Sequence, residues 1–227
     1  MIKIVTVRHF EEESNKEYKD ISSHIGGTIQ GAVRASLMPQ LVHKLFGDEE
    51  YELHTYTNDV NNVPTSRSYY TVQLLKPAEK KLYSKSSNVD DLIKAVKETK
   101  YKNVLICWEH GEFPDIIKGL CGVKTNYDDT VNDLKKKNKK NRIYPTKTFK
   151  VATKDVLNIV RSAPEYVVQN DATKMDLVDD SFAYSPIWQF TLNVKSVSVF
   201  AGYSSTYDKT TDTWTVTDTS DISITYK

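Results

Sequence analysis

Histidine or arginine follows two short apolar runs of this chain at the point where each run ends. Arg8 and His9 follow the run at residues 1–7, and His110 closes a similar run at residues 103–109. Short runs rich in β-branched residues indicate buried strands of a parallel sheet. Because ligands bind beyond the carboxyl ends of such strands, the two histidines are predicted to share one site.

A third segment adds a second arginine to this predicted site. Arg67 lies near the start of a helix that we expect to open at Thr65 or Ser66 and to run to Leu75. A helix start presents free backbone N–H groups and a positive dipole end, both of which favour phosphate. Arginine forks bind phosphoryl oxygens, and a neutral imidazole can attack phosphorus while a second donates to an equatorial oxygen. Two arginines and two histidines therefore suit a phosphoryl group.

The elements that would position these residues alternate between strand and helix over residues 1–125. Besides the two apolar runs, the patterns predict a strand at 51–56 and helices at 29–46, 65–75, 90–100 and 114–120. This order predicts a three-layer α/β/α fold with a mostly parallel central sheet. Crossover connections would bring the carboxyl ends of the strands to one edge.

The remaining residues, 126–227, follow a different pattern and are the less certain elaboration of the fold. Residues 126–145 are polar, with a basic run at 135–142, and are expected to form a loop or a short exposed helix. The patterns further predict a helix at 154–161 and strands at 187–200, 213–217 and 222–226. This strand-rich extension could extend the sheet or form an antiparallel flap. No linker separates it, so residues 1–227 are interpreted as one domain.

Composition limits the classes of partner. The 31 Lys and Arg residues nearly cancel the 30 Asp and Glu residues, so charge predicts neither nucleic acid nor an anionic membrane as a partner. The sequence lacks a signal-peptide pattern and any apolar run near the roughly 20 residues that span a bilayer, which predicts a cytoplasmic protein.

Cys107 and Cys121 are expected to be reduced structural thiols. Trp108, Trp188 and Trp214 are expected in the core rather than on a base-stacking surface.

Ordered segments of the chain resemble motifs of the histidine phosphatase superfamily, which includes phosphoglycerate mutases and acid phosphatases. Residues 5–11 (VTVRHFE) are similar to its opening Arg-His-Gly-Glu signature, and residues 67–72 (RSYYTV) to its Arg-x-x-x-Thr-Ala helix. Residues 104–111 (VLICWEHG) resemble its late strand ending in His-Gly, and Asn15 falls where many members have a phosphate-contacting asparagine. Residues 31–35 and the Leu-Ile-Cys-Trp-Glu-His stretch are also similar to a less characterised branch of the family.

The resemblance extends over residues 1–125 and implies a phosphatase that hydrolyses a small phosphomonoester. His9 would be the nucleophile and would become a phosphohistidine. Arg8, Arg67 and His110 would bind the phosphoryl oxygens and stabilise the transition state, which is the main protein contribution to phosphoryl transfer. Water would then release phosphate. We expect no cofactor and no metal, because no carboxylate–histidine cluster is recognised in the sequence.

Two departures from the family pattern keep other functions open. Phe10 replaces a small residue, and its ring would narrow the pocket or reshape the loop. Gly111 stands where one branch of the family has an acid, which leaves Glu112 and Glu79 as candidate proton donors. The alternatives are a phosphomutase, whose pocket would hold the phosphorylated product for retransfer, and a catalytically idle binding or structural module. The motifs predict neither the identity of the substrate nor an oligomeric state.

Overall fold

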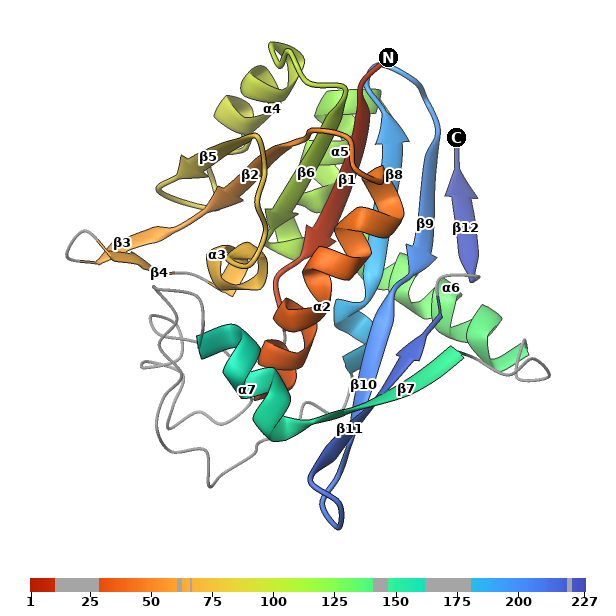
Figure 1. Cartoon of the computed structure of the whole chain (residues 1–227). Coiled ribbons are helices and arrows are strands. Elements are labelled where there is room, and N and C mark those ends of the chain that lie inside the picture. Colours follow the sequence, from red (N-terminus) through yellow and green to blue (C-terminus); the bar gives the residue numbers. More distant parts are fainter. Residues whose placement is uncertain (11–28, 61–62, 66, 141–146, 162–180, 220–221) are drawn as a thin grey trace.

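A seven-stranded mixed sheet runs through the centre of the protein (Figure 1). Four adjacent strands are parallel: β1 (Lys3–Arg8), β6 (Asn103–Trp108), β2 (Glu52–Tyr56) and β5 (Glu79–Tyr83). Beyond β1 the direction alternates through β8 (Pro186–Thr191), β9 (Val197–Ala201) and β12 (Ser223–Tyr226). The strand order is β12-β9-β8-β1-β6-β2-β5. The structure is a computed structural model that describes the chain except for residues 11–28, 61–62, 66, 141–146, 162–180 and 220–221.

The two apolar runs form adjacent strands in the middle of this sheet, as predicted. β1 and β6 pair in parallel register, from Lys3 opposite Asn103 to Arg8 opposite Trp108. All of β6 and all of β1 beyond Lys3 are buried. Neither strand alternates between polar and apolar residues, because both of its faces are covered. The carboxyl ends of the two strands therefore reach the same edge of the sheet.

Helices cover both faces of the sheet and enclose two hydrophobic cores. One core includes α2 (Ile29–Phe46) and α3 (Arg67–Val72), with α7 (Thr153–Arg161) packed against α2. The other includes α4 (Val89–Lys97), α5 (Phe113–Cys121) and α6 (Tyr127–Lys140). Alternate side chains of β1 enter different cores, with Val5 and Val7 on the α2 side and Ile4 on the α5 side.

The sequence predictions for the tryptophans and cysteines are confirmed. Trp108, Trp188 and Trp214 are each fully buried. Cys107 and Cys121 are buried and free. The pKa of the Cys107 thiol is raised because burial disfavours its thiolate, so this side chain has the character of a packing residue.

Helix α6 is longer than the loop or short helix expected from its polar composition. Tyr127, Val131 and Leu134 recur at helical spacing and are buried, and these three apolar side chains anchor an otherwise charged segment. The side-chain oxygen Oδ1 of Asn126 accepts a hydrogen bond of 3.0 Å from the backbone N–H of Asp129 and so caps the first turn. A small number of well-spaced apolar residues is enough to fix this helix.

The C-terminal part both extends the sheet and forms a second sheet. The single strand predicted at 187–200 is wrong, because a turn with Asn193 at a φ of 61° separates β8 from β9. The second, antiparallel sheet has the order β10-β11-β7 and consists of β10 (Tyr203–Asp208), β11 (Thr213–Asp218) and β7 (Lys147–Ala152). A further antiparallel pair consists of β3 (Asn58–Val60) and β4 (Val63–Thr65), so Thr65 ends a strand and does not open the helix predicted at 65–75. The fold is therefore mixed α/β, and the expectation of a mostly parallel sheet holds only for β1, β6, β2 and β5.

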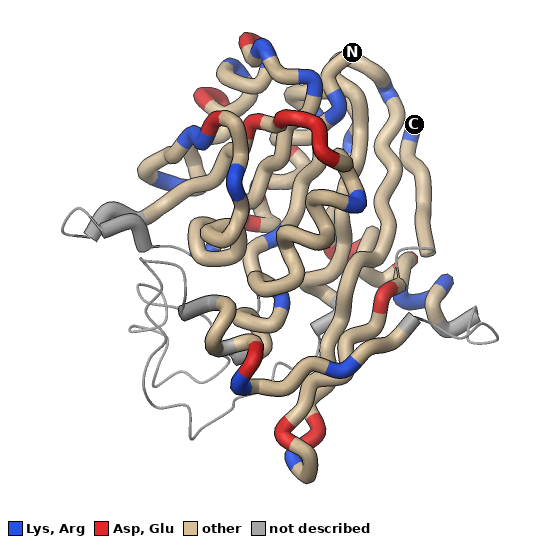
Figure 2. The backbone as a smooth tube through the Cα atoms, in the orientation of Figure 1, with Lys and Arg blue, Asp and Glu red and all other residues tan. Residues whose placement is uncertain are grey.

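Lys and Arg residues alternate with Asp and Glu residues along the backbone drawn in Figure 2, apart from the basic end of α6. Lys136 in this basic segment forms an ion pair of 3.1 Å with Asp133, and the amine of Lys137 donates to the carbonyl of Ser223 at 2.7 Å. None of the helices in the described part of the chain is long and apolar enough to cross a membrane.

Gly202 stands at a close approach between the end of β9 and the start of β8, next to the elements that border the site. A Cβ added at Gly202 would lie 2.8 Å from the carbonyl oxygen of Ser185 and 2.8 Å from Cδ1 of Ile187. We expect Gly202→Ala to lower the free energy of unfolding by about 1–3 kcal/mol, because backbone must shift to relieve the clash. The midpoint and slope of urea denaturation measure this change.

Gly111→Ala is the matched control for this prediction. A Cβ at Gly111 would meet no heavy atom within 4 Å, so this variant should unfold close to the wild-type midpoint. Equal midpoints for Gly202→Ala and the wild type would contradict the close approach described above.

Candidate active site

The parallel pairing of β1 and β6 continues one residue past both strands and brings His9 next to Glu109. The backbone N–H of His9 donates to the carbonyl of Trp108 at 3.3 Å. Glu109 caps the short 3₁₀ turn η1 (His110–Glu112), which leads into α5. The two histidines predicted to share a site therefore lie together, with ring centroids 6.5 Å apart.

The ring of His9 is fixed by backbone groups on one side and is 1% exposed. Its Nδ1 lies 2.8 Å from the carbonyl oxygen of Phe10, and because a carbonyl only accepts, Nδ1 carries a hydrogen. The backbone N–H of Phe10 donates to Oγ1 of Thr71 at 2.8 Å, and that hydroxyl donates to the carbonyl of Arg67 at 2.7 Å. Helix α3 thus holds the His9 loop in place, and Nε2 faces away from this contact.

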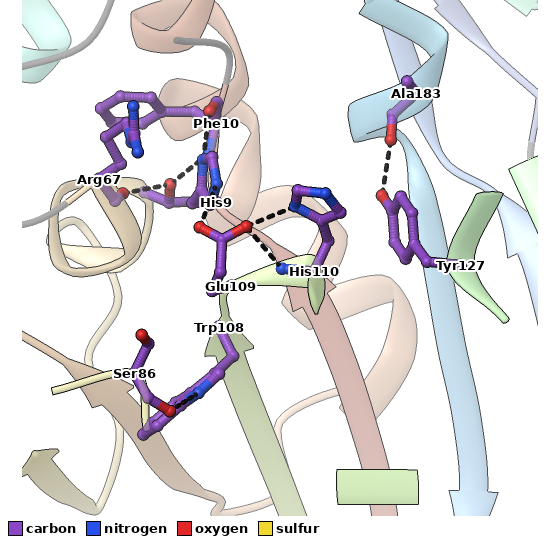
Figure 3. Close-up of polar contacts among 10 residues, drawn as sticks. His9, Phe10, Arg67, Ser86, Trp108, Glu109, His110, Tyr127 and Ala183 are labelled. Carbon is purple, nitrogen blue, oxygen red and sulfur yellow. Dashed lines mark hydrogen bonds and ion pairs between the residues drawn. The ribbon is translucent and has the colours of Figure 1, made fainter. Parts of the chain in front are cut away.

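Glu109 is the residue that sequence reasoning missed. Figure 3 shows its carboxylate between the rings of His9 and His110. One oxygen, Oε2, lies 3.1 Å from Nε2 of His9, and the other, Oε1, contacts Nδ1 of His110. Oε1 also accepts a hydrogen bond of 3.1 Å from the backbone N–H of His110. Glu109 stands at the end of a predicted strand, directly before a candidate histidine. This position could have identified it as a residue of the site.

Opposing effects set the protonation of this cluster. Burial alone would raise the pKa of the Glu109 carboxyl, but hydrogen bonds from His110 and His9 outweigh burial and hold that pKa well below its usual range. Burial lowers the pKa of His9, Glu109 raises it in part, and the charges of Arg67 and Arg8 lower it further. The net direction for the pKa of His9 is downward, so the neutral imidazole with its hydrogen on Nδ1 is favoured.

The side chain of Arg8 packs against two aromatic rings that border the site. Its guanidinium carbon lies 3.9 Å from the ring centroid of Tyr184, in the 3₁₀ turn η2 (Ser181–Tyr184), and 5.6 Å from that of Tyr127. The Tyr184 ring is also 5.9 Å from the ring of His9. Nε of Arg8 is buried and has no hydrogen-bond partner among the described residues. Cation–π contacts therefore position a guanidinium that still has a donor to offer.

His110 is the more accessible of the two histidines. Its side chain is 34% exposed, and its ring centroid lies 5.0 Å from that of Tyr127. The hydroxyl of Tyr127 donates to the carbonyl of Ala183 at 2.6 Å and so ties α6 to η2. Tyr127 and Tyr184 thus form an aromatic border to the site. No local sequence pattern predicted this border, because both tyrosines are far in sequence from Arg8 and His9.

The remaining predicted site residues have different outcomes. Arg67 begins α3, as expected, and Figure 3 places it on the other side of His9 from His110. Glu112 closes η1, and its backbone N–H donates to the carbonyl of Glu109 at 3.2 Å. Asn15 lies outside the described residues. The ring of Phe10 packs in the core on the α2 side of the sheet and does not lie between the two imidazoles.

Glu79 does not lie near the histidines. It begins β5 in register with Glu52, at the amino ends of the parallel strands and so at the opposite edge of the sheet. Its carboxylate lies 3.8 Å from Nζ of Lys81 and 3.7 Å from Nζ of Lys100. Glu79 is thus part of a surface charge cluster, because its strand starts rather than ends at that position.

The premise that the chain has no carboxylate–histidine cluster is wrong. His9, Glu109 and His110 each offer one ligand atom, and these three atoms lie within 4.8 Å of one another. The sequence did not reveal the cluster, because it requires the register between β1 and β6.

Comparisons with known proteins add little to this geometry. Neither protein-family profiles nor curated protein sequences give a match to the chain. Among solved structures, the product of open reading frame Rv3214 from Mycobacterium tuberculosis is similar to it, with 15% sequence identity and a TM-score of 0.34. The aligned region covers 52% of this chain and 78% of that one. A likeness at this level carries no argument about function.

The hydrogen bond between Glu109 and His9 generates a test of the site's electrostatics. We expect Glu109→Gln to lower the pKa of His9 further, because the carboxylate is what partly offsets the effect of burial. NMR titration of the imidazole ¹⁵N signals measures this change. Glu112→Gln is the matched control and should leave the His9 titration unchanged. A His9 pKa that rises or stays constant in Glu109→Gln would contradict the arrangement.

Proposed function

We propose that this protein is a phosphatase that hydrolyses a small phosphomonoester through a phosphohistidine at His9. The proposal includes a three-layer α/β/α core of the histidine phosphatase type and a cytoplasmic site of action. The observation that carries it is the fixed ring of His9. Since Nδ1–H is bound to the carbonyl of Phe10, Nε2 is the nitrogen that can act as a nucleophile.

The proposed reaction has two steps. In the first, Nε2 of His9 attacks phosphorus, an N–P bond forms, and the ester P–O bond breaks to release an alcohol. In the second, water attacks phosphorus, the N–P bond breaks, and phosphate leaves. The backbone contact at Nδ1 keeps the ring in one orientation through both steps, which holds the nucleophile close to the in-line position.

Positive groups around His9 support the stabilisation of a phosphoryl group. The charges of Arg67 and Arg8 act on the His9 ring, and the rings of His9 and His110 lie near each other. In this proposal Arg8, Arg67 and His110 bind the equatorial oxygens. Donors that are already in place cost little reorganisation when charge develops in the transition state.

Glu109 supplies the carboxylic acid that the sequence left unassigned. Its oxygen 3.1 Å from Nε2 stands where the phosphoryl group must bind, so substrate has to displace it. Loss of the His9 hydrogen bond and the approach of a phosphate dianion both raise the pKa of this carboxyl. We propose that Glu109 then takes up a proton from solvent and donates it to the leaving oxygen.

The same contact is the observation that favours an idle binding or structural module. With the carboxylate in place, Nε2 of His9 is shielded from any ligand. Release of phosphate from a panel of phosphorylated metabolites separates the two functions. No release from any of them, together with no binding of vanadate, would favour the idle module.

The first test of the phosphatase is the removal of its nucleophile. We expect His9→Ala to lower kcat/KM for para-nitrophenyl phosphate by about a thousandfold or more, because the proposed covalent intermediate forms on the ring that this change removes. His43→Ala is the matched control, since His43 is exposed and pairs with Asp48 at 3.5 Å. Undiminished hydrolysis by His9→Ala would rule out the phosphohistidine mechanism.

The second test concerns the acid. Glu109→Gln should lower kcat/KM for glycerol phosphate by roughly a hundredfold or more, because an alkoxide leaves poorly without a proton. The same variant should affect para-nitrophenyl phosphate much less, since nitrophenolate is a good leaving group. Glu112→Gln serves as the control for a nearby carboxylate. Equal losses on the two substrates would argue against Glu109 as the proton donor.

A further inference from the structure

The cluster of His9, Glu109 and His110 has the composition and spacing of a metal site. Its three ligand atoms, one from each side chain, lie within 4.8 Å of one another. We propose that this cluster binds a divalent transition-metal ion of the Zn²⁺ type, and that the metal and a phosphoryl group exclude each other. The proposal concerns a second ligand for the same side chains and does not depend on the phosphatase being active.

The ligand set selects the class of metal. Two imidazole nitrogens and one carboxylate oxygen suit Zn²⁺ and related first-row ions, whereas Mg²⁺ and Ca²⁺ prefer sites made of oxygen atoms. Three protein ligands leave at least one position for water, as in zinc sites with two histidines and one glutamate. The side chains of Glu109 and His110 are 25% and 34% exposed, so an ion can reach the site from solvent.

The spacing needs only a small adjustment. In a tetrahedral site with bonds of about 2.0–2.1 Å, neighbouring ligand atoms are roughly 3.4 Å apart. Nε2 of His9 and Oε2 of Glu109 are 3.1 Å apart, and Oε1 of the same carboxylate contacts Nδ1 of His110. The cluster therefore has to open by a few tenths of an ångström on the His9 side and by more on the His110 side.

Backbone contacts around the cluster orient two of its ligands. Metal-binding histidines commonly donate their second ring N–H to a carbonyl, which directs the other nitrogen at the metal. The Nδ1–H of His9 makes this contact with the carbonyl of Phe10 at 2.8 Å. The carboxylate of Glu109 is held by the backbone N–H of His110 at 3.1 Å. These contacts would remain in place when an ion enters between Nε2 and Oε2.

Nearby positive charge has opposite effects on the binding of a metal ion and of a phosphoryl group. Arg67 and Arg8 act electrostatically on the ring of His9, so both oppose a cation at Nε2 and both favour an anion there. Removal of the Arg67 charge is therefore expected to tighten metal binding while it weakens oxyanion binding. A change of opposite sign for two ligands is not expected from a general disturbance of the fold.

The test uses the full chain, stripped of metal with EDTA and transferred to phosphate-free buffer. Co²⁺ is added while visible d–d absorption is followed, and Zn²⁺ binding is measured by calorimetry. We expect one ion per chain, and Glu109→Gln and His110→Ala should each weaken binding by roughly tenfold or more. Arg67→Met should tighten Zn²⁺ binding by a few-fold and weaken vanadate binding. Vanadate should also displace Co²⁺ from the wild type.

The controls separate this site from other histidines and from misfolding. His43→Ala removes an exposed histidine beside Asp48 and should bind Zn²⁺ as the wild type does. Circular dichroism and thermal melting check each variant, and His110→Ala carries the test where Glu109→Gln does not fold.

Three outcomes would overturn the proposal: no cobalt absorption in the wild type, unchanged affinity in both ligand variants, or parallel loss of metal and vanadate binding in Arg67→Met. Phosphatase assays in EDTA test the proposed function separately, because they contain no free metal.

Discussion

The parallel pairing of β1 with β6 is the interaction on which the candidate site depends. Arg8 lies opposite Trp108, and the next hydrogen bond, from the His9 N–H to the carbonyl of Trp108, places Glu109 beside the His9 ring. A slip of one residue would turn the side chains of a strand to the opposite face of the sheet. The register is held because β1 sends alternate side chains into two different cores. Packing of β1 in the two cores thus determines how His9 and Glu109 lie at the carboxyl ends of the strands.

A partly buried anion balances the positive groups that gather at the site. Glu109 lies between two imidazoles, and the charges of Arg67 and Arg8 act at the same place. Buried charges are costly unless they are paired and hydrogen-bonded, and the carboxylate meets this requirement with its contacts to both histidines. An incoming oxyanion would replace one negative group by another. In the proposed mechanism, substrate binding at this edge is therefore an exchange of one anion for another.

Local sequence patterns predicted most elements but not the way they pair. The helix at 29–46 and the two central strands follow directly from their apolar spacing. The antiparallel direction of β8 depends on long-range pairing with β1, which no local pattern encodes. Glu109 stayed unassigned for the same reason, since its contact with His9 exists only once β1 and β6 are in register. The predicted contribution of Asn15 falls outside the described residues and stays a prediction.

The neighbours of β1 have a consequence for the order in which the protein folds. Val7 is opposite Cys107 in β6 and opposite Ile187 in β8, so both partners of β1 come from distant parts of the chain. Closing such long loops costs entropy before any contact is gained, which slows folding. During synthesis, β1 waits unpaired on one side until β8 has left the ribosome, and unpaired apolar strands are prone to aggregate. His9 thus precedes nearly all of its surroundings in synthesis, yet its environment is complete only after Tyr184 has been added.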